Sequence, residues 1–172
     1  MSNDTIFLVD ANSLITPHLS FYPFDFAPSF WSQLETHIAS GRIAILDMVK
    51  DEILRGTDSL CTWMQDAPVG LLIDHRSPEI LSNYQKVLTH VQTQPCYKPS
   101  ALHEWSKASV ADPWIIATAM THGYTIVTFE GRNNNLSAHQ PSKEAKIPNV
   151  AEAFDANVIR LYDMMRILEF HL

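Results

Sequence analysis

Apolar residues are distributed along the chain in two alternating patterns. Short runs rich in β-branched residues predict buried strands at residues 5–10, 43–46, 69–73 and 124–129. Between them, apolar residues recur every three or four positions, which predicts helices at residues 30–39, 48–55, 78–92, 113–122 and 157–170. The alternation of strands with helices predicts an α/β fold with a largely parallel sheet covered on both faces.

Turn-forming residues fit these boundaries. Gly41, Gly56 and Gly123 follow predicted helices, and Asp47 is suited to capping the helix that begins at residue 48. Residues 131–146 are polar and predict a loop.

No internal repeat or second domain is visible, so we expect a single domain over residues 1–172. In open parallel sheets, ligands bind beyond the carboxyl ends of the strands, which directs attention to the residues found there.

Composition narrows the class of protein. The chain has 172 residues, of which 46% are hydrophobic and 18% charged, as expected for a globular protein. No apolar run approaches the ~20 residues that span a membrane, and the polar N-terminus has no basic leader, so we expect a cytoplasmic protein. Cys61 and Cys96 lack metal-binding spacing and predict reduced thiols. The net charge of −7 argues against a simple nucleic-acid binder, although bound divalent cations would neutralise part of it.

Acidic residues occupy four positions that the predicted fold should bring to one edge. Asp10 and Glu130 each end a predicted strand, Glu52 lies in the helix after the second strand, and Asp112 begins the helix before the fourth. If the first and fourth strands are parallel neighbours, all four carboxylates emerge at the same edge of the sheet. Oxygen ligands of this kind suit Mg²⁺ or Mn²⁺. The sequence therefore predicts a metal site there.

Each acid also has a structural interpretation. Asp10 could form a turn, and Glu52 could be a solvated charge in the polar segment 50–52. Asp112 precedes Pro113, as a helix N-cap often does, although a capping carboxylate can also bind a metal. Glu130 could simply end a strand at the surface.

Other catalytic chemistries find little support. The eight histidines show no zinc-binding spacing, and the chain has neither a GxSxG motif nor a glycine-rich phosphate loop. A phosphoaspartate hydrolase would need a second Asp where Asn12 stands. The similar triplet at residues 155–157 predicts a loop or cap. Basic residues either form a phosphate-binding rim around the acids or are scattered surface charges: Arg42, Lys50, Arg55, Arg132, Lys143 and Lys146.

Four segments together resemble the signature segments of PIN-domain ribonucleases, in the same order. They are FLVDANSLI at residues 7–15, VKDEI at 49–53, ADPWIIA at 111–117 and IVTFE at 126–130. The resemblance spans roughly residues 5–135, and the tail from Lys146 onward resembles a poorly characterised PIN-like branch. Each segment alone is weak, whereas the ordered set is fairly specific.

The resemblance implies a Rossmann-like three-layer α/β/α sandwich with a central, mostly parallel sheet of about five strands. It implies a Mg²⁺- or Mn²⁺-dependent endoribonuclease, commonly the toxin of a VapC-type toxin–antitoxin pair. Its partners would be an RNA substrate and a cognate antitoxin that could bind DNA, and self-association stays open. The residues carried over as catalytic and metal-binding are Asp10, Glu52, Asp112 and Glu130, with Asn12 assisting and Arg55, Arg132, Lys143 and Lys146 as candidate RNA contacts.

One position departs from the family pattern. The fourth acid is usually an Asp, whereas here it is Glu130, whose longer side chain could bind the metal directly or through water. Two other functions stay open. A PIN-like binding or scaffold protein without hydrolytic activity is the first alternative, and a nuclease acting on DNA is the less favoured second.

Overall fold

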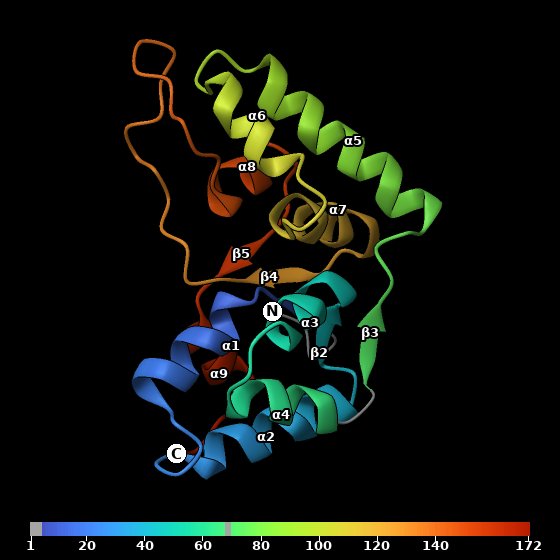
Figure 1. Ribbon diagram of the computed structural model, residues 1–172, viewed down its shortest axis with the longest axis vertical. Coiled ribbons are helices and arrows are strands. Elements are labelled where there is room, and N and C mark those ends of the chain that lie inside the picture. The colour runs from blue at the N-terminus through green and yellow to red at the C-terminus, as the bar shows by residue number, and fades with distance from the viewer. Residues whose placement is uncertain (1–4, 68–69) are drawn as a thin grey trace.

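The computed structural model describes residues 5–67 and 70–172, which are organised around one parallel sheet (Figure 1). The strands run in the order β3-β2-β1-β4-β5, and every neighbouring pair is parallel. Their bounds are β1 Phe7–Val9, β2 Ile43–Leu46, β3 Leu71–Ile73, β4 Thr125–Val127 and β5 Val158–Ile159. All five carboxyl ends therefore point towards one edge of the sheet.

Helices cover both faces of this sheet. Figure 1 shows α5, α6, α7 and α8 gathered on one side and α1, α2, α4 and α9 on the other. The helical bounds are α1 Asn12–Thr16, η1 Pro17–Phe21 (a π-helical turn), α2 Pro28–Ala39, α3 Asp47–Leu54, α4 Ser59–Asp66, α5 Pro78–Thr93, α6 Pro99–Trp105, α7 Asp112–His122, α8 Ile147–Glu152 and α9 Leu161–Ile167.

The central strands form the middle of the hydrophobic core. Every residue of β1, β2 and β4 is buried, whereas the outer strands β3 and β5 keep partly exposed residues. Strands covered on both faces need apolar side chains at consecutive positions, not at alternate ones. This requirement explains why their sequences, FLV, IAIL and TIV, are continuous short runs.

The expected fold class is confirmed: the protein is α/β, with five parallel strands between helical layers. The predicted strand at 43–46 has the observed bounds of β2, and β1 and β4 lie within their predicted runs. The run at 69–73 contains β3, although its first residue lies outside the described residues, as do residues 1–4. Residues 131–146 form no helix or strand within the sheet, as expected.

The prediction of one final helix over residues 157–170 is wrong at its start. Val158 and Ile159 form β5, which pairs with β4 through Ile126 and Val127, and α9 begins only at Leu161. The turn before β5 holds Asp155 at a φ of 54°, which confirms the predicted loop there. A two-residue strand is too short to show its own periodicity, and Val158 also fits the helical spacing.

The sequence interpretation missed the helical turns α1 and η1 and the helices α4, α6 and α8. Most are short, so their apolar residues span too few turns to set a pattern. Helix α6 begins at Pro99, where proline is well tolerated in the first turn of a helix. Cys61 and Cys96 are free thiols, as expected. None of the helices in the described ranges is long and apolar enough to cross a membrane.

Candidate active site

Asp10 is held in a fixed position just beyond the end of β1. Its side chain is buried, with 5% of the residue exposed. The backbone N–H of Asp10 donates a 2.9 Å hydrogen bond to the carbonyl of Val127, and the hydroxyl of Thr128 donates a 2.8 Å hydrogen bond to Oδ2 of Asp10. The carboxylate is thus aligned by the neighbouring strand β4.

Two further side chains bind the ends of β1 and β4 together. Oδ1 of Asn12 accepts a 2.8 Å hydrogen bond from the backbone N–H of Phe129. The hydroxyl of Ser13 donates a 2.9 Å hydrogen bond to the carbonyl of Val127. Asn12, expected to assist the site, therefore acts on the backbone of the segment that leads to Glu130.

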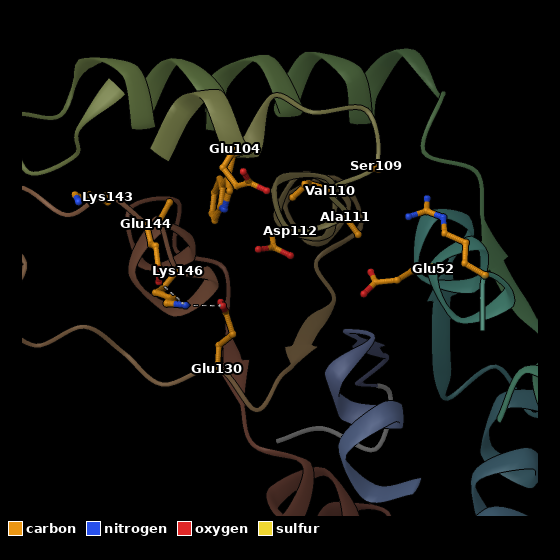
Figure 2. Close-up of a pocket in the computed structure, with 13 residues that line it drawn as sticks. Glu52, Glu104, Ser109, Val110, Ala111, Asp112, Glu130, Lys143, Glu144 and Lys146 are labelled. Atoms are coloured by element: carbon orange, nitrogen blue, oxygen red, sulfur yellow. Dashed lines mark hydrogen bonds and ion pairs between the residues drawn. The ribbon is translucent and has the colours of Figure 1, made fainter. Parts of the chain in front are cut away.

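Asp112 is the first residue of α7, but its side chain does not cap that helix. The N-cap position is Ala111, and no side-chain capping hydrogen bond is formed there. The interpretation of Asp112 as a helix cap is therefore wrong. Figure 2 shows its carboxylate in an open space, with the side chain of Glu52 pointing towards it from α3.

This space is a cleft of about 480 Å³ at the carboxyl edge of the sheet. Three of the four predicted acids line it, and Asp10 is coupled to them electrostatically from the end of β1. The lining residues come from α3 and its C-terminal end, from α6, from the segment that leads into α7, from the segment after β4 and from the loop before α8: Glu52, Arg55, Glu104, Trp105, Ser109, Val110, Ala111, Asp112, Glu130, Lys143, Glu144, Ala145 and Lys146.

Asp10, Glu52 and Asp112 hold their protons more tightly than isolated acids do. Burial is the main cause for Asp112, and together with the charges of Asp10, Glu130 and Glu52, against the opposing charge of Lys146, it raises the pKa of Asp112 to about 7. Burial also raises the pKa of Asp10 to about 6, although the hydrogen bond from Thr128 acts against this shift. Burial also raises the pKa of Glu52, although the positive charge of Arg55 opposes part of this shift. The four carboxylates thus share one repulsive field.

Glu130 differs from the other three acids because both of its carboxylate oxygens contact donors at the start of α8. Oε2 accepts a 2.8 Å hydrogen bond from the backbone N–H of Ile147, the first residue of α8. Oε1 lies 3.3 Å from Nζ of Lys146. Figure 2 shows the side chain directed towards Lys146 rather than towards Asp112.

The predicted basic rim is only partly assembled. Arg55, Lys143 and Lys146 line the cleft. Arg132 does not line it and instead forms an ion pair with Glu152 of α8. Two of the other basic residues also lie elsewhere, because Lys50 lines a separate depression and Nε of Arg42 donates a hydrogen bond to the carbonyl of Thr5.

A second group of potential metal ligands lies at the ends of β2 and β3. Asp47, Asp74 and His75 each place a ligand atom within 4.8 Å of the others, and within the described chain no other set of three does so. Nδ1 of His75 lies 2.8 Å from Oδ2 of Asp47, and Asp74 is exposed and paired with Arg76. This group could hold a metal ion, but its ligands are largely satisfied by one another and by Arg76.

The donor set of the acidic cleft fits a hard divalent cation. Mg²⁺ is usually held by only one or two carboxylates together with waters and substrate phosphates, so it does not need three carboxylates in mutual contact. Burial and like charges raise the pKa values of Asp10 and Asp112. A bound cation would lower these pKa values, because its positive charge favours the ionised carboxylates. These residues therefore fit Mg²⁺ or Mn²⁺.

One protein-family model, DUF4411, matches residues 7–172, which is nearly the whole chain. The chain belongs to the DUF4411 family. The family is described as a domain of unknown function. No curated protein matches the sequence. Among solved structures, this DUF4411 chain is similar to the crystal structure of VapBC2 from Rickettsia felis bound to a DNA fragment from their promoter. The TM-score is 0.49 at 14% identity, over 91% of this chain and 98% of that chain.

Several residues beyond the strand ends received no functional role from the sequence. Thr128 was part of a quoted segment but received no role, although its position at a strand end pointed towards Asp10. Asp47 was interpreted only as a cap, whereas it lies in the first turn of α3, and Leu46 is the N-cap. Asp47 and the pair Asp74–His75 each directly follow a strand, and this was the one available signal for their group.

Proposed function

We propose that this protein is a Mg²⁺- or Mn²⁺-dependent endoribonuclease that hydrolyses phosphodiester bonds at the acidic cleft. The main support for this proposal is that acidic residues from distant segments of the chain meet at one cleft. Burial and like charges raise the pKa values of two of these acids, Asp10 and Asp112. Raised pKa values in a cleft are typical of functional sites. The ordered resemblance of four segments to PIN-domain ribonucleases supports the same reaction.

The residues divide into two roles in this proposal. Asp10, Glu52 and Asp112 would hold the cation, and Glu130 adds to the negative field of the cleft. Thr128 and Asn12 keep the ends of β1 and β4 in register, which fixes the direction of the Asp10 carboxylate. When bound, the cation supplies activation of a water and neutralisation of charge on the phosphodiester.

Cationic side chains would hold the RNA backbone over these acids. Arg55 lines the cleft close enough to Glu52 to lower its pKa. Lys143 and Lys146 lie across the cleft from Glu52, in the loop before α8 (Figure 2). Phosphate contacts of this kind position a nucleic acid without reading its sequence. Because the net charge is −7, we expect binding to depend on this local arrangement and on the cation, and to weaken steeply with salt.

The biological setting is part of the same proposal and rests on the resemblance alone. We propose that the enzyme acts in the cytoplasm as the toxin of a toxin–antitoxin pair, inhibited by a cognate antitoxin protein. Expression of the chain should then arrest growth, and co-expression of a small neighbouring gene should relieve the arrest. Arrest that persists in an Asp112→Asn variant would argue against toxicity through RNA cleavage.

The direct test of the activity uses one end-labelled single strand, prepared as RNA and as DNA of the same sequence. Purified protein should cleave the RNA internally with Mn²⁺ or Mg²⁺ and stop when EDTA is added. Cleavage of the DNA strand alone would replace RNA with DNA as the substrate. Metal binding without cleavage of either strand would favour a non-catalytic scaffold.

A further inference from the structure

Glu130 is the fourth of the predicted acids and lines the cleft, but its hydrogen bonds are with residues at the start of α8 and not with the other acids. Both of its carboxylate oxygens meet N–H donors at the start of α8, at 2.8 Å from the Ile147 nitrogen and 3.3 Å from Nζ of Lys146. Its side chain is 18% exposed, so these contacts are partly shielded from water. A metal bound by Glu130 would have to compete with both donors.

Lys146 is the cation that Glu130 holds at the cleft. Its Nζ lies between Glu130 and Glu144, at 3.3 and 3.2 Å, and its side chain remains 35% exposed. The positive charge of Lys146 is close enough to lower the pKa of Asp112, against the effect of the neighbouring acids. An amine that is partly exposed beside the acids is suited to contact a phosphate.

The loop that carries Lys146 is tethered at both ends. At the far end, the backbone N–H of Lys98 donates to the carbonyl of Ser142, and the N–H of Ser142 donates to the carbonyl of Cys96. At the cleft end, Glu130 provides the contact to residues 146 and 147. The segment between the two tethers has no regular structure, and burial of Ala145 and Ile147 anchors its backbone beside Lys146. The Glu130 contacts then join the side chain of Lys146 and the start of α8 to the segment that follows β4.

We propose that Glu130 is a positioning residue that fixes Lys146 and the start of α8 at the cleft, and that Lys146, not Glu130, engages the substrate there. The inference rests on the proposed function and identifies the residue that would hold a phosphate at its cleft. It also explains why a Glu, with its longer side chain, occupies position 130 instead of an Asp. An Asp at position 130 would be one methylene shorter and would not reach the Ile147 nitrogen from the same backbone position.

The Glu130→Asp variant separates the two roles, because a metal ligand and a positioning residue respond differently to it. Mn²⁺ affinity is measured by calorimetry without RNA, and the affinity for a labelled RNA is measured in EDTA. Glu130→Asp, which keeps the negative charge, should keep Mn²⁺ affinity near that of the wild type. Asp112→Asn, which removes a proposed ligand, should weaken it by more than about tenfold, the lower end of the loss found when only an outer partner of a metal ligand is changed.

RNA binding should show the opposite pattern. Lys146→Ala should reduce the slope of log affinity against log salt by about one, the amount expected for one lost phosphate contact. Glu130→Asp should lower RNA affinity although every charge is kept, and the double variant Glu130→Asp/Lys146→Ala should be no weaker than Lys146→Ala alone. Lys146→Arg, which keeps the charge, should restore most of the binding.

Hydrogen exchange provides a readout that needs neither metal nor RNA. The Ile147 amide should exchange faster in Glu130→Asp than in the wild type. The inference would be overturned if Glu130→Asp weakened Mn²⁺ binding as much as Asp112→Asn does, or if the losses of RNA affinity were additive in the double variant. Failure of the wild type to cleave RNA, with these binding patterns intact, would instead count against the proposed activity and leave the role of Glu130 standing.

Discussion

The hydroxyl of Thr128 donates a 2.8 Å hydrogen bond to Oδ2 of Asp10, across 118 positions of sequence. Both residues are buried, and they lie just beyond the neighbouring strands β1 and β4. The contact joins the two segments that carry the first and the fourth acids. It also opposes the effect of burial, because a donor to the carboxylate favours its charged form.

Thr128→Val should destabilise the protein most where Asp10 is ionised. Loss of the donor leaves a buried carboxylate oxygen unsatisfied, which costs about 1–3 kcal/mol. Urea unfolding should therefore show a larger loss of unfolding free energy at pH 8 than at pH 5. Thr118→Val is the matched control, because the Thr118 hydroxyl is buried without a hydrogen-bond partner among the described residues. Equal losses in the two variants would contradict the role assigned to Thr128.

Without metal, stability should fall as the pH rises towards neutrality. The pKa of Asp112 is raised to about 7 and that of Asp10 to about 6, above the ordinary value of 3.8. The folded state therefore binds these protons more tightly than the unfolded state. Their stabilising contribution is complete below pH 3.8 and is lost as the pH rises through about 6 to 7.

Thermal melts in EDTA between pH 4 and pH 8 test this dependence. The Asp112→Asn variant should show a flatter profile, because it lacks the group with the higher pKa. Mn²⁺ should restore more stability at pH 8 than at pH 5, since metal binding requires deprotonated carboxylates. A wild-type profile that rises steadily from pH 4 to pH 8 in EDTA would contradict the raised pKa values.

Lys143→Ala should weaken RNA binding through charge alone. Lys143 is exposed in the loop before α8 and lines the cleft. Removal of one phosphate contact should lower the salt slope of binding by about one, with little dependence on RNA sequence. Lys86→Ala is the control, because Lys86 is an exposed lysine of α5 and does not line the cleft. Similar salt slopes for the two variants would place the RNA elsewhere.

Gly70→Ala should disturb the packing between α2 and the segment before β3. A Cβ at Gly70 would lie 2.0 Å from the carbonyl oxygen of Ile38, so the backbone would have to move. Overpacking of this kind costs about 1–3 kcal/mol. Gly131→Ala is the control, because only a guanidinium nitrogen of Arg160 lies near its added Cβ, at 4.0 Å. Denaturant midpoints should separate the two variants, and a neutral Gly70→Ala would contradict this packing.

The parallel sheet was predictable because its central strands are buried on both faces. That burial demands continuous apolar runs, such as those at β1 and β2, and such runs are visible in the sequence. The shared edge of Asp10 and Glu130 then follows from the direction of parallel strands. In contrast, β5 has two residues, and its identity depends on pairing with Ile126 and Val127, a tertiary contact that local periodicity does not reveal.

The rim of the cleft was less predictable because side-chain partners decide it. Arg132 follows Glu130 by two positions, but an ion pair with Glu152 draws it away from the cleft. The engagement of Glu130 by Lys146 and Ile147 likewise depends on how a polar loop returns to the sheet edge. Charge spacing along a loop contains no information about that path.

The central claim is that Asp112 is a metal ligand of a ribonuclease, and one substitution tests it most directly. Asp112→Asn keeps the shape of the side chain and removes its charge. RNA cleavage with Mn²⁺ should fall by at least about a hundredfold, the upper end of the loss found when an outer partner of a metal ligand is changed.

The same preparation is then melted in EDTA, where Asp112→Asn should have an equal or higher melting temperature than the wild type, because a buried carboxylate surrounded by like charges has been removed. Cleavage by the variant at the wild-type rate, or wild-type cleavage that continues in EDTA, would contradict the metal-dependent nuclease.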